Sequence, residues 1–280
     1  MNGSWIDLAI LAALGAVAEW TALRVLLHWR PAALIARNYR QVEVVSRGGA
    51  TFAAPVAVGA VGAVLLGLDA EAVLAATLAA VLFGLLGWLD DARGATGVRG
   101  LKGHLMRLLR HREVTTGLVK ALGGTGVGLW AGYMLGAEGW QVLPAGAVIA
   151  LSANTLNALD ARPGRATKLL LAASIAIIAL TVRGPAPGAI GVLAVLLGAA
   201  AVFAPADLRE RIMLGDTGAN PLGAVLGISV VSLTSWPTWL AVAAGLLAFC
   251  MAADRWSLTA VMERTPGLGW LDRLGRRKLP

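Results

Sequence analysis

The chain has 280 residues, of which 58% are hydrophobic and only 14% are charged, and its mean hydropathy is +0.73. A soluble domain carries about 25% charged residues, so this composition excludes an ordinary soluble protein and indicates a polytopic membrane protein. The net charge of +8 comes from short basic clusters between apolar segments without aromatic interleaving, which argues against nucleic-acid binding. The single cysteine, Cys250, excludes an intramolecular disulfide and a cysteine-based zinc site.

Nine segments approach the roughly 20 apolar residues that a transmembrane helix needs. The first begins at Trp5, contains Asp7 and Glu19 and lacks a basic region before it, so we interpret it as a retained helix rather than a signal peptide. Several segments are rich in Gly and Ala, which favours a compact all-α bundle of about nine transmembrane helices. The predicted spans are 5–27, 50–68, 71–89, 114–135, 140–158, 167–182, 187–204, 217–234 and 237–253.

The basic residues indicate the orientation of this bundle. One set of loops holds nearly all the Lys and Arg, whereas the other set holds only Arg183. The positive-inside rule therefore makes the first set cytoplasmic, with the N-terminus outside and the C-terminus in the cytoplasm of a multi-pass cell-membrane protein. The basic loops are 28–49, 90–113, 159–166, 205–216 and 254–280.

The sequence predicts two regions of the chain. Residues 1–253 form the predicted bundle, and residues 254–280 form a basic cytoplasmic tail. The tail contains apolar residues mixed with Arg and Lys, which is typical of short amphipathic helices lying on the membrane surface. A partly disordered tail is the alternative interpretation.

Three polar motifs stand at the predicted cytoplasmic ends of different spans. The second has a three-residue spacing that places its members on roughly one helix face. The third lies in a glycine-flanked turn before a helix, whose free N–H groups favour anions. The motifs are LDD with Asp90 and Asp91, N-x-x-N-x-x-D with Asn154, Asn157 and Asp160, and M-L-G-D-T-G with Asp216 and Thr217.

Carboxylates at one interface, without clustered His or Cys, favour a hard cation such as Mg²⁺, with Mn²⁺ as the alternative. Mg²⁺ takes its remaining ligands from water and substrate phosphate, and nearby basic loops can hold a phosphorylated substrate. The combination predicts phosphoryl transfer beside the lipid headgroups. Each motif alone also fits a structural role, as a solvated helix end, a helix–helix contact or a capped turn. The structural alternative for Lys120, near the cytoplasmic end of its span, is a snorkelling side chain.

The ordered set of motifs resembles the polyprenyl-phosphate N-acetylhexosamine-1-phosphate transferases, which include the phospho-N-acetylmuramoyl-pentapeptide transferase of peptidoglycan synthesis. The resemblance covers roughly residues 1–253, and NYRQVEVVSRGGATF is similar to an early loop of that family, with Ser46 where Pro is usual. The family implies attack of polyprenyl (undecaprenyl) phosphate on the β-phosphate of a UDP-sugar, giving polyprenyl-diphospho-sugar and UMP with Mg²⁺ bound. This would be the first membrane step of a cell-envelope glycan.

The resemblance also implies roles for individual residues. The metal ligands would be Asp216 and Asp91, and Asp90 and Asp91 would lie at the phosphates, one of them as a base or positioning group. Asn157 and Asp160 would face the nucleotide-sugar, and Lys102 would pair with phosphate. The predicted substrate-binding set is completed by Asn154, Gly48, Gly49 and Thr217.

The chain departs from the family pattern at two places. Asp160 is followed by ARPG where the family usually continues G-L-D-G, and none of the three histidines lies in the tail, where the family usually has a His-rich loop. We therefore interpret the chain as a divergent member with altered substrate recognition. The alternative is a non-catalytic relative that binds polyprenyl phosphate as a scaffold or regulator. A homodimer is left open, and a transporter is disfavoured because the acidic residues avoid the midplane of the membrane.

Overall fold

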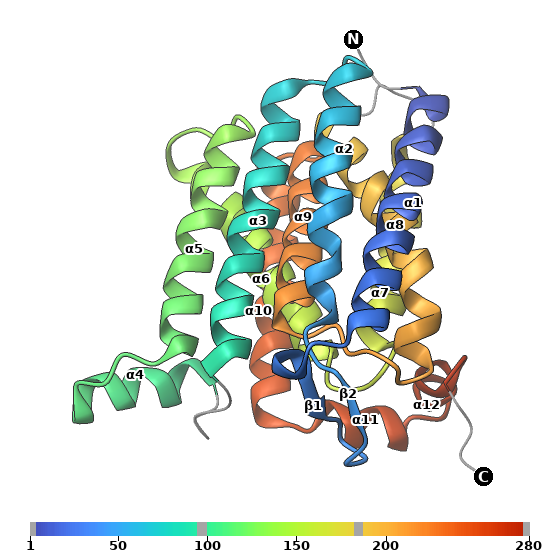
Figure 1. The fold of residues 1–280 in the computed structure, drawn as a ribbon. Helices are drawn as coiled ribbons and strands as arrows, with labels where there is room; N and C mark the ends of the chain where they lie inside the picture. The colour runs from blue at the N-terminus through green and yellow to red at the C-terminus, as the bar shows by residue number, and fades with distance from the viewer. Residues whose placement is uncertain (1–3, 94–99, 182–186, 277–280) are drawn as a thin grey trace.

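The computed structural model describes residues 4–93, 100–181 and 187–276, apart from several side chains between 100 and 109. It is 81% helical, which confirms the all-α prediction (Figure 1). The strands in the described residues form one short antiparallel pair, in which Ile35 lies opposite Val45.

Each predicted span contains one helix in the described part of the chain, and the helix boundaries lie within a few residues of the prediction. In Figure 1 these helices run side by side along the long axis of the molecule. Their bounds are α1 Trp5–Trp29, α2 Ala53–Leu65, α3 Ala70–Arg93, α5 Thr116–Met134, α6 Val142–Leu159, α7 Arg165–Leu180, α8 Gly188–Leu208, α9 Asp216–Leu233 and α10 Trp236–Arg255.

Within the described residues, six helical segments are long and apolar enough to cross a membrane by length and composition. The helices outside this group are α5, α7 and α9. The α7 helix has only 16 residues, α5 is rich in glycine and contains Lys120, and α9 begins with Asp216 and contains Asn220. For these three helices, spanning stays a prediction. The six segments are 5–29, 48–65, 70–93, 139–159, 188–208 and 236–255.

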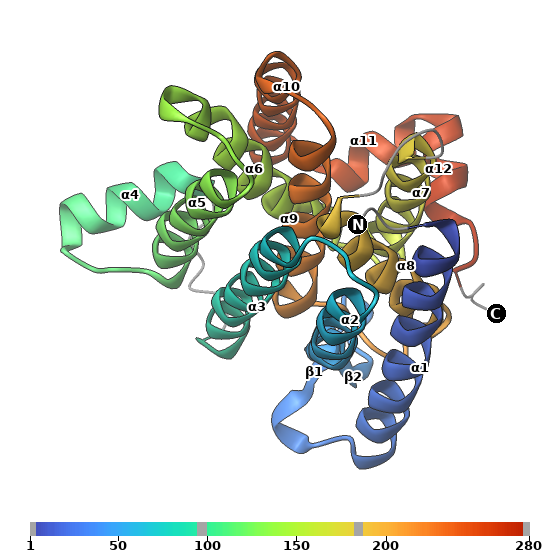
Figure 2. The ribbon, with the colours of Figure 1, turned by 90° about the horizontal axis from the view of Figure 1, so that it is seen from above.

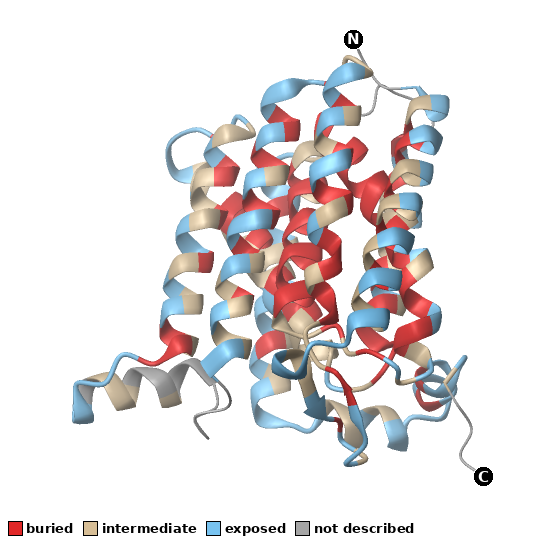
Figure 3. Cartoon of the chain, viewed as in Figure 1, coloured by how far each residue is buried: buried red, intermediate tan, exposed pale blue. Residues whose placement is uncertain are grey.

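The core lies along α8 and α9, whose residues are buried on most sides (Figure 3). From above, α9 lies between α3 and α6, while α1 packs on α8 (Figure 2). Gly15 and Gly198 allow α1 and α8 to approach closely, because a methyl group at either position would overlap the backbone of the other helix. Small residues at such contacts let membrane helices pack tightly by van der Waals attraction.

One end of the bundle carries a layer of short elements, opposite the end at which the N-terminus lies (Figure 1). The layer contains the basic loops of the sequence, so this is the predicted cytoplasmic end. A further short 3₁₀ helix, η3 Gly139–Gln141, leads into α6. The elements of the layer are η1 Ala32–Leu34, β1 Ile35–Arg37, β2 Glu43–Val45, η2 Gly48–Phe52, α4 Gly100–His111, α11 Leu258–Arg264 and α12 Pro266–Arg273.

The described part of the tail folds into α11 and α12 and docks on the start of α7. The buried carboxylate of Asp272 accepts hydrogen bonds from Arg165 Nε at 2.8 Å and Arg165 Nη2 at 3.2 Å. Burial alone would raise the pKa of Asp272, but the Arg165 and Arg276 guanidinium groups outweigh it and hold that pKa below its usual range. Lys168 Nζ adds hydrogen bonds to the carbonyl oxygens of Leu271 and Asp272.

Candidate active site

Two carboxylates and one ammonium group meet where α3, α5 and α9 converge at the predicted cytoplasmic end. Lys120 Nζ on α5 lies 2.9 Å from Asp90 Oδ2 on α3, and it also forms an ion pair with Asp216 Oδ2 at the start of α9. The side chains of Lys120, Asp90 and Asp216 are 19%, 23% and 24% exposed. This partial exposure leaves the three charged groups accessible to a ligand.

Two amides complete the surroundings of Asp216. In the amide orientation that pairs donors with acceptors, Asn157 Nδ2 on α6 donates to Asp216 Oδ1 at 2.7 Å, and Asn157 Oδ1 accepts from Lys120 at 3.2 Å. Asn220 Nδ2 donates to the backbone carbonyl of Asp216 at 2.8 Å, one turn along α9. The Asp216 carboxylate is therefore held by Lys120 from α5 and Asn157 from α6, while Asn220 holds its backbone.

Asp91 has a different environment from its neighbour Asp90. Its carboxylate accepts hydrogen bonds from Asp216 N at 3.3 Å, Thr217 N at 3.0 Å and Thr217 Oγ1 at 2.6 Å. It therefore caps the N-terminus of α9 from a neighbouring helix, where the unpaired N–H groups favour an anion. Gly87 permits this close approach, because a methyl group there would overlap the Asp216 backbone.

Asp160 fixes the turn that precedes α9. Its Oδ2 accepts a hydrogen bond from Gly215 N at 2.9 Å. Gly215 has a φ of +71°, and an added Cβ would lie 2.8 Å from Ser46 O and 3.0 Å from Asp91 Oδ2. Burial and the neighbouring carboxylates, Asp207 first among them, raise the pKa of Asp160 well above its usual value.

The glycine pair 48–49 lies against the same turn. Gly48 N donates to Met213 O and Gly49 N to Leu214 O, both at 2.8 Å, so this loop runs alongside the segment that leads to Asp216. Thr51 Oγ1, at the far end of η2, donates to the buried carboxyl of Glu19 on α1 at 2.5 Å. The pair therefore contributes backbone contacts that hold the Asp216 turn in place.

Two of the predicted site residues lie elsewhere or are not described. Asn154 points away from the cluster and toward α10, where its Nδ2 donates to Cys250 Sγ at 3.2 Å. The side chain of Lys102, in α4, lies outside the described part of the structure. The remaining predicted residues lie in or next to the cluster, and their roles stay predictions.

Lys120 is the site residue that sequence reasoning missed. Its position near the end of an apolar segment suggested a snorkelling side chain, but it points into the bundle and joins two carboxylates. The available signal was charge balance. Two carboxylates that converge inside a helical bundle need a cation, and Lys120 is the only Lys or Arg within the predicted span 114–135.

The donor set fits a Mg²⁺ ion that shares its coordination with substrate. No group of three or more His, Cys, Asp or Glu side chains in the described residues is arranged to hold a metal without other ligands. Mg²⁺ usually binds one or two carboxylates and completes its octahedron with water and phosphate oxygens. Asp90 and Asp216, which face each other across Lys120, supply that number of carboxylates.

A comparison with protein-family models matches residues 73–234 to glycosyl transferase family 4. The match covers more than half of the chain and extends from α3 to the end of α9. The chain belongs to this family. A comparison with curated proteins found no match.

Membership of glycosyl transferase family 4 gives the polar cluster its chemical setting. The family consists of polyprenyl-phosphate sugar-1-phosphate transferases, which identifies the chain as a glycosyl phosphotransferase with membrane helices. The matched segment contains Asp90, Lys120, Asn157 and Asp216. The glycine pair 48–49 and the tail lie outside it.

Proposed function

We propose that this protein transfers a sugar-1-phosphate from a UDP-sugar to polyprenyl phosphate at the cytoplasmic face of the cell membrane and releases UMP. The product would be the first lipid-linked intermediate of a cell-envelope glycan. The observation that carries this proposal is the convergence of Asp90, Lys120 and Asp216 at one accessible end of an apolar bundle, within the family match.

The reaction is a phosphoryl transfer in which positioning and charge neutralisation do most of the work. A phosphate oxygen of the acceptor forms a bond to the β-phosphorus of the UDP-sugar. The bond from that phosphorus to the bridging oxygen breaks, and UMP leaves with the bridging oxygen. Lys120 lies where it can neutralise the charge that develops on the phosphate oxygens, and Asn157 holds the Asp216 carboxylate in position.

Asp90 and Asp216 are the residues that would hold Mg²⁺, or Mn²⁺ in its place. When bound, the ion would neutralise phosphate charge and orient the two substrates. For Asp91 we propose a positioning role, because its oxygens already accept three hydrogen bonds from the start of α9. The sequence-based alternative, in which Asp91 is a metal ligand, remains a distinct prediction.

An apolar groove supports a lipid acceptor. A groove of about 220 Å³ lies between α2, α3 and α9, and its lining is apolar except for Thr217, which is hydrogen-bonded to Asp91. An isoprenoid chain in this groove would bring its phosphate near the cluster. We expect Ala53→Trp, which fills the groove, to raise the KM for polyprenyl phosphate and leave that for the UDP-sugar unchanged.

The decisive experiment is a UMP-release assay over a panel of UDP-sugars, with polyprenyl phosphate and with or without Mg²⁺. We expect Mg²⁺-dependent release by the wild type and none by Asp90→Asn or Asp216→Asn. Asp254→Asn, an exposed carboxylate at the end of α10, is the matched control and should keep full activity. Full activity in both site variants would refute the metal-site assignment.

A non-catalytic relative is the second candidate, and one observation favours it. Lys120 pairs with both carboxylates, which is the arrangement expected of a purely structural ion-pair network. The same assay separates the two candidates. Binding of polyprenyl phosphate without UMP release from any sugar in the panel would identify a scaffold or regulator.

A further inference from the structure

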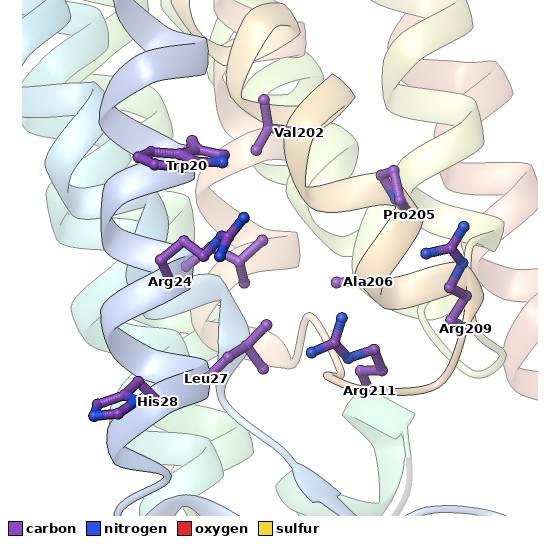
Figure 4. A pocket seen from close by; sticks show the side chains of 10 residues that line it. Trp20, Arg24, Leu27, His28, Val202, Pro205, Ala206, Arg209 and Arg211 are labelled. Atoms are coloured by element: carbon purple, nitrogen blue, oxygen red, sulfur yellow. The ribbon is translucent and has the colours of Figure 1, made fainter.

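A cavity lined by three arginines lies between α1 and the end of α8, separate from the catalytic cluster. It has a volume of about 450 Å³, within the usual range of about 300–1,000 Å³ for ligand sites. Arg24 projects into it from α1 and Arg211 from the segment that follows α8, and Arg209 of the same segment lines its edge (Figure 4). Trp20 and His28 line its α1 side, and apolar side chains from both helices form the remainder.

The positive charge of this cavity is not balanced by a carboxylate in the described residues. No Asp or Glu lines it, and no salt bridge is formed by Arg24, Arg209 or Arg211 in the part of the chain that the structure describes. The nearest acidic residues in sequence have other partners. Glu210 pairs with Arg40 at 3.1 Å, and Asp207 accepts from Thr167 Oγ1 at 2.6 Å.

The cavity opens where an apolar helix face meets the basic end of the bundle. The outer face of α1 above it carries exposed Val17 and Trp20, which is typical of contact with lipid chains. Arg24 lies over the Trp20 ring, with its guanidinium carbon 5.1 Å from the ring centroid. Basic pockets between membrane helices, at the depth of the headgroups, are suited to anionic lipids.

We propose that this cavity binds the phosphate headgroup of an anionic glycerophospholipid, with the acyl chains lying along α1. Guanidinium groups bind phosphate oxygens in bidentate geometry, and the arginines approach the cavity from two sides. A soluble phosphate would meet the same charges but would leave the apolar face of α1 without a partner. Since the segment that contains Arg211 leads directly into Asp216 at the start of α9, the bound lipid would also hold that segment in place beside the catalytic cluster.

Native mass spectrometry of the delipidated full-length protein, titrated with phosphatidylglycerol or phosphatidylcholine in detergent, tests this proposal. The cavity variant combines Arg24→Gln, Arg209→Gln and Arg211→Gln. We expect the wild type to retain phosphatidylglycerol in preference to phosphatidylcholine. The cavity variant should bind phosphatidylglycerol more weakly by about fivefold per arginine, or about 100-fold together.

The matched control removes the same number of charges from the same end of the molecule. It combines Arg37→Gln, Arg255→Gln and Arg264→Gln, all at exposed positions outside the cavity. It should bind phosphatidylglycerol as the wild type does. Equal losses in the two triple variants would show only a general charge effect and would overturn the proposal.

Two competitors distinguish the possible sources of the phosphate. Millimolar inorganic phosphate should not displace the phospholipid, and displacement would identify a soluble anion as the occupant. Stronger retention of polyprenyl phosphate than of phosphatidylglycerol, lost in the cavity variant, would assign the cavity to the acceptor substrate and overturn the proposal.

If the triple variant aggregates, the three single variants are titrated instead, and unchanged affinity for phosphatidylglycerol in all three would refute the proposal. None of these readouts requires transferase activity, so failure of the proposed function leaves this test intact.

Discussion

The close approach of α3 and α9 gives the sharpest test of how the site is built. In Gly87→Ala the new Cβ would lie 2.8 Å from Thr217 N and closer still to the Asp216 carbonyl, whereas ordinary contact begins at 3.4 Å. The closest contact, 2.2 Å to the Asp216 carbonyl oxygen, is about 1.2 Å too short, so the start of α9 must move by about 1 Å. Overpacking of this kind costs about 1–3 kcal/mol, and a misplacement of about 1 Å at a reacting centre lowers the rate by about 10²-fold.

The matched control is Gly126→Ala on α5, where an added Cβ has no neighbour within 4 Å. Both substitutions gain about 1 kcal/mol of helix propensity, so their difference isolates the steric effect at α9. We expect Gly87→Ala to lose at least tenfold in kcat for UMP release and to melt at a lower temperature than the control. If the two variants are equally active and equally stable, the proposed dependence of the site on the α3–α9 contact is wrong.

Three further predictions concern packing, the tail and the ion pairs. Gly198→Ala should lower the free energy of unfolding in detergent by about 1–3 kcal/mol relative to Gly245→Ala. The new methyl group at position 198 would push α1 away from α8, whereas the methyl group at position 245 has open space. The ionised carboxylate of Asp272 stabilises the docked tail at neutral pH. Because the pKa of Asp272 is lowered in the folded protein, this contribution is lost only as the pH falls below 3.8, the usual pKa of an Asp side chain. Hydrogen exchange should show the tail docked at pH 5 and released at lower pH, and released at pH 7 in Asp272→Asn; a docked tail in that variant contradicts the assignment. Lys120→Gln leaves two carboxylates without their counterion, so Mg²⁺ should raise its melting temperature more than that of the wild type; equal shifts would contradict this explanation.

The helices of the bundle could be predicted because hydropathy is a local property of the chain. Each predicted span contains one α-helix, and the ends differ by a few residues, in some helices because polar residues extend the helix beyond its apolar segment. In α3, for example, the helix continues through Asp90 and Asp91 to Arg93. The docking of the tail could not be predicted, since it depends on the buried contact of Asp272 with Arg165, more than 100 residues away.

Which residues belong to the candidate site could be predicted in part, because every second loop of a transmembrane bundle lies on the same side of the membrane. The finer arrangement depends on rotation about each helix axis. A three-residue step falls about 60° short of a full turn, so Asn154 and Asp160 differ by about 120°, and Asn154 faces α10 instead of the cluster. The different partners of Asp90 and Asp91 follow from the same rotation, since adjacent helical residues point about 100° apart.

The order in which the site can assemble follows from the distances along the chain between its parts. Gly48 and Gly49 pair with Met213 and Leu214, and Asp91 binds the amide of Thr217, which is 126 residues later. A chain that has inserted only its first helices therefore holds Asp90 and Asp91 without the turn that organises them. Because closing such long loops carries an entropic cost before any contact compensates it, the catalytic end is among the last parts of the protein to acquire its native structure. During synthesis, Asp90 and Asp91 stay apart from Asp216 until α9 has entered the bundle.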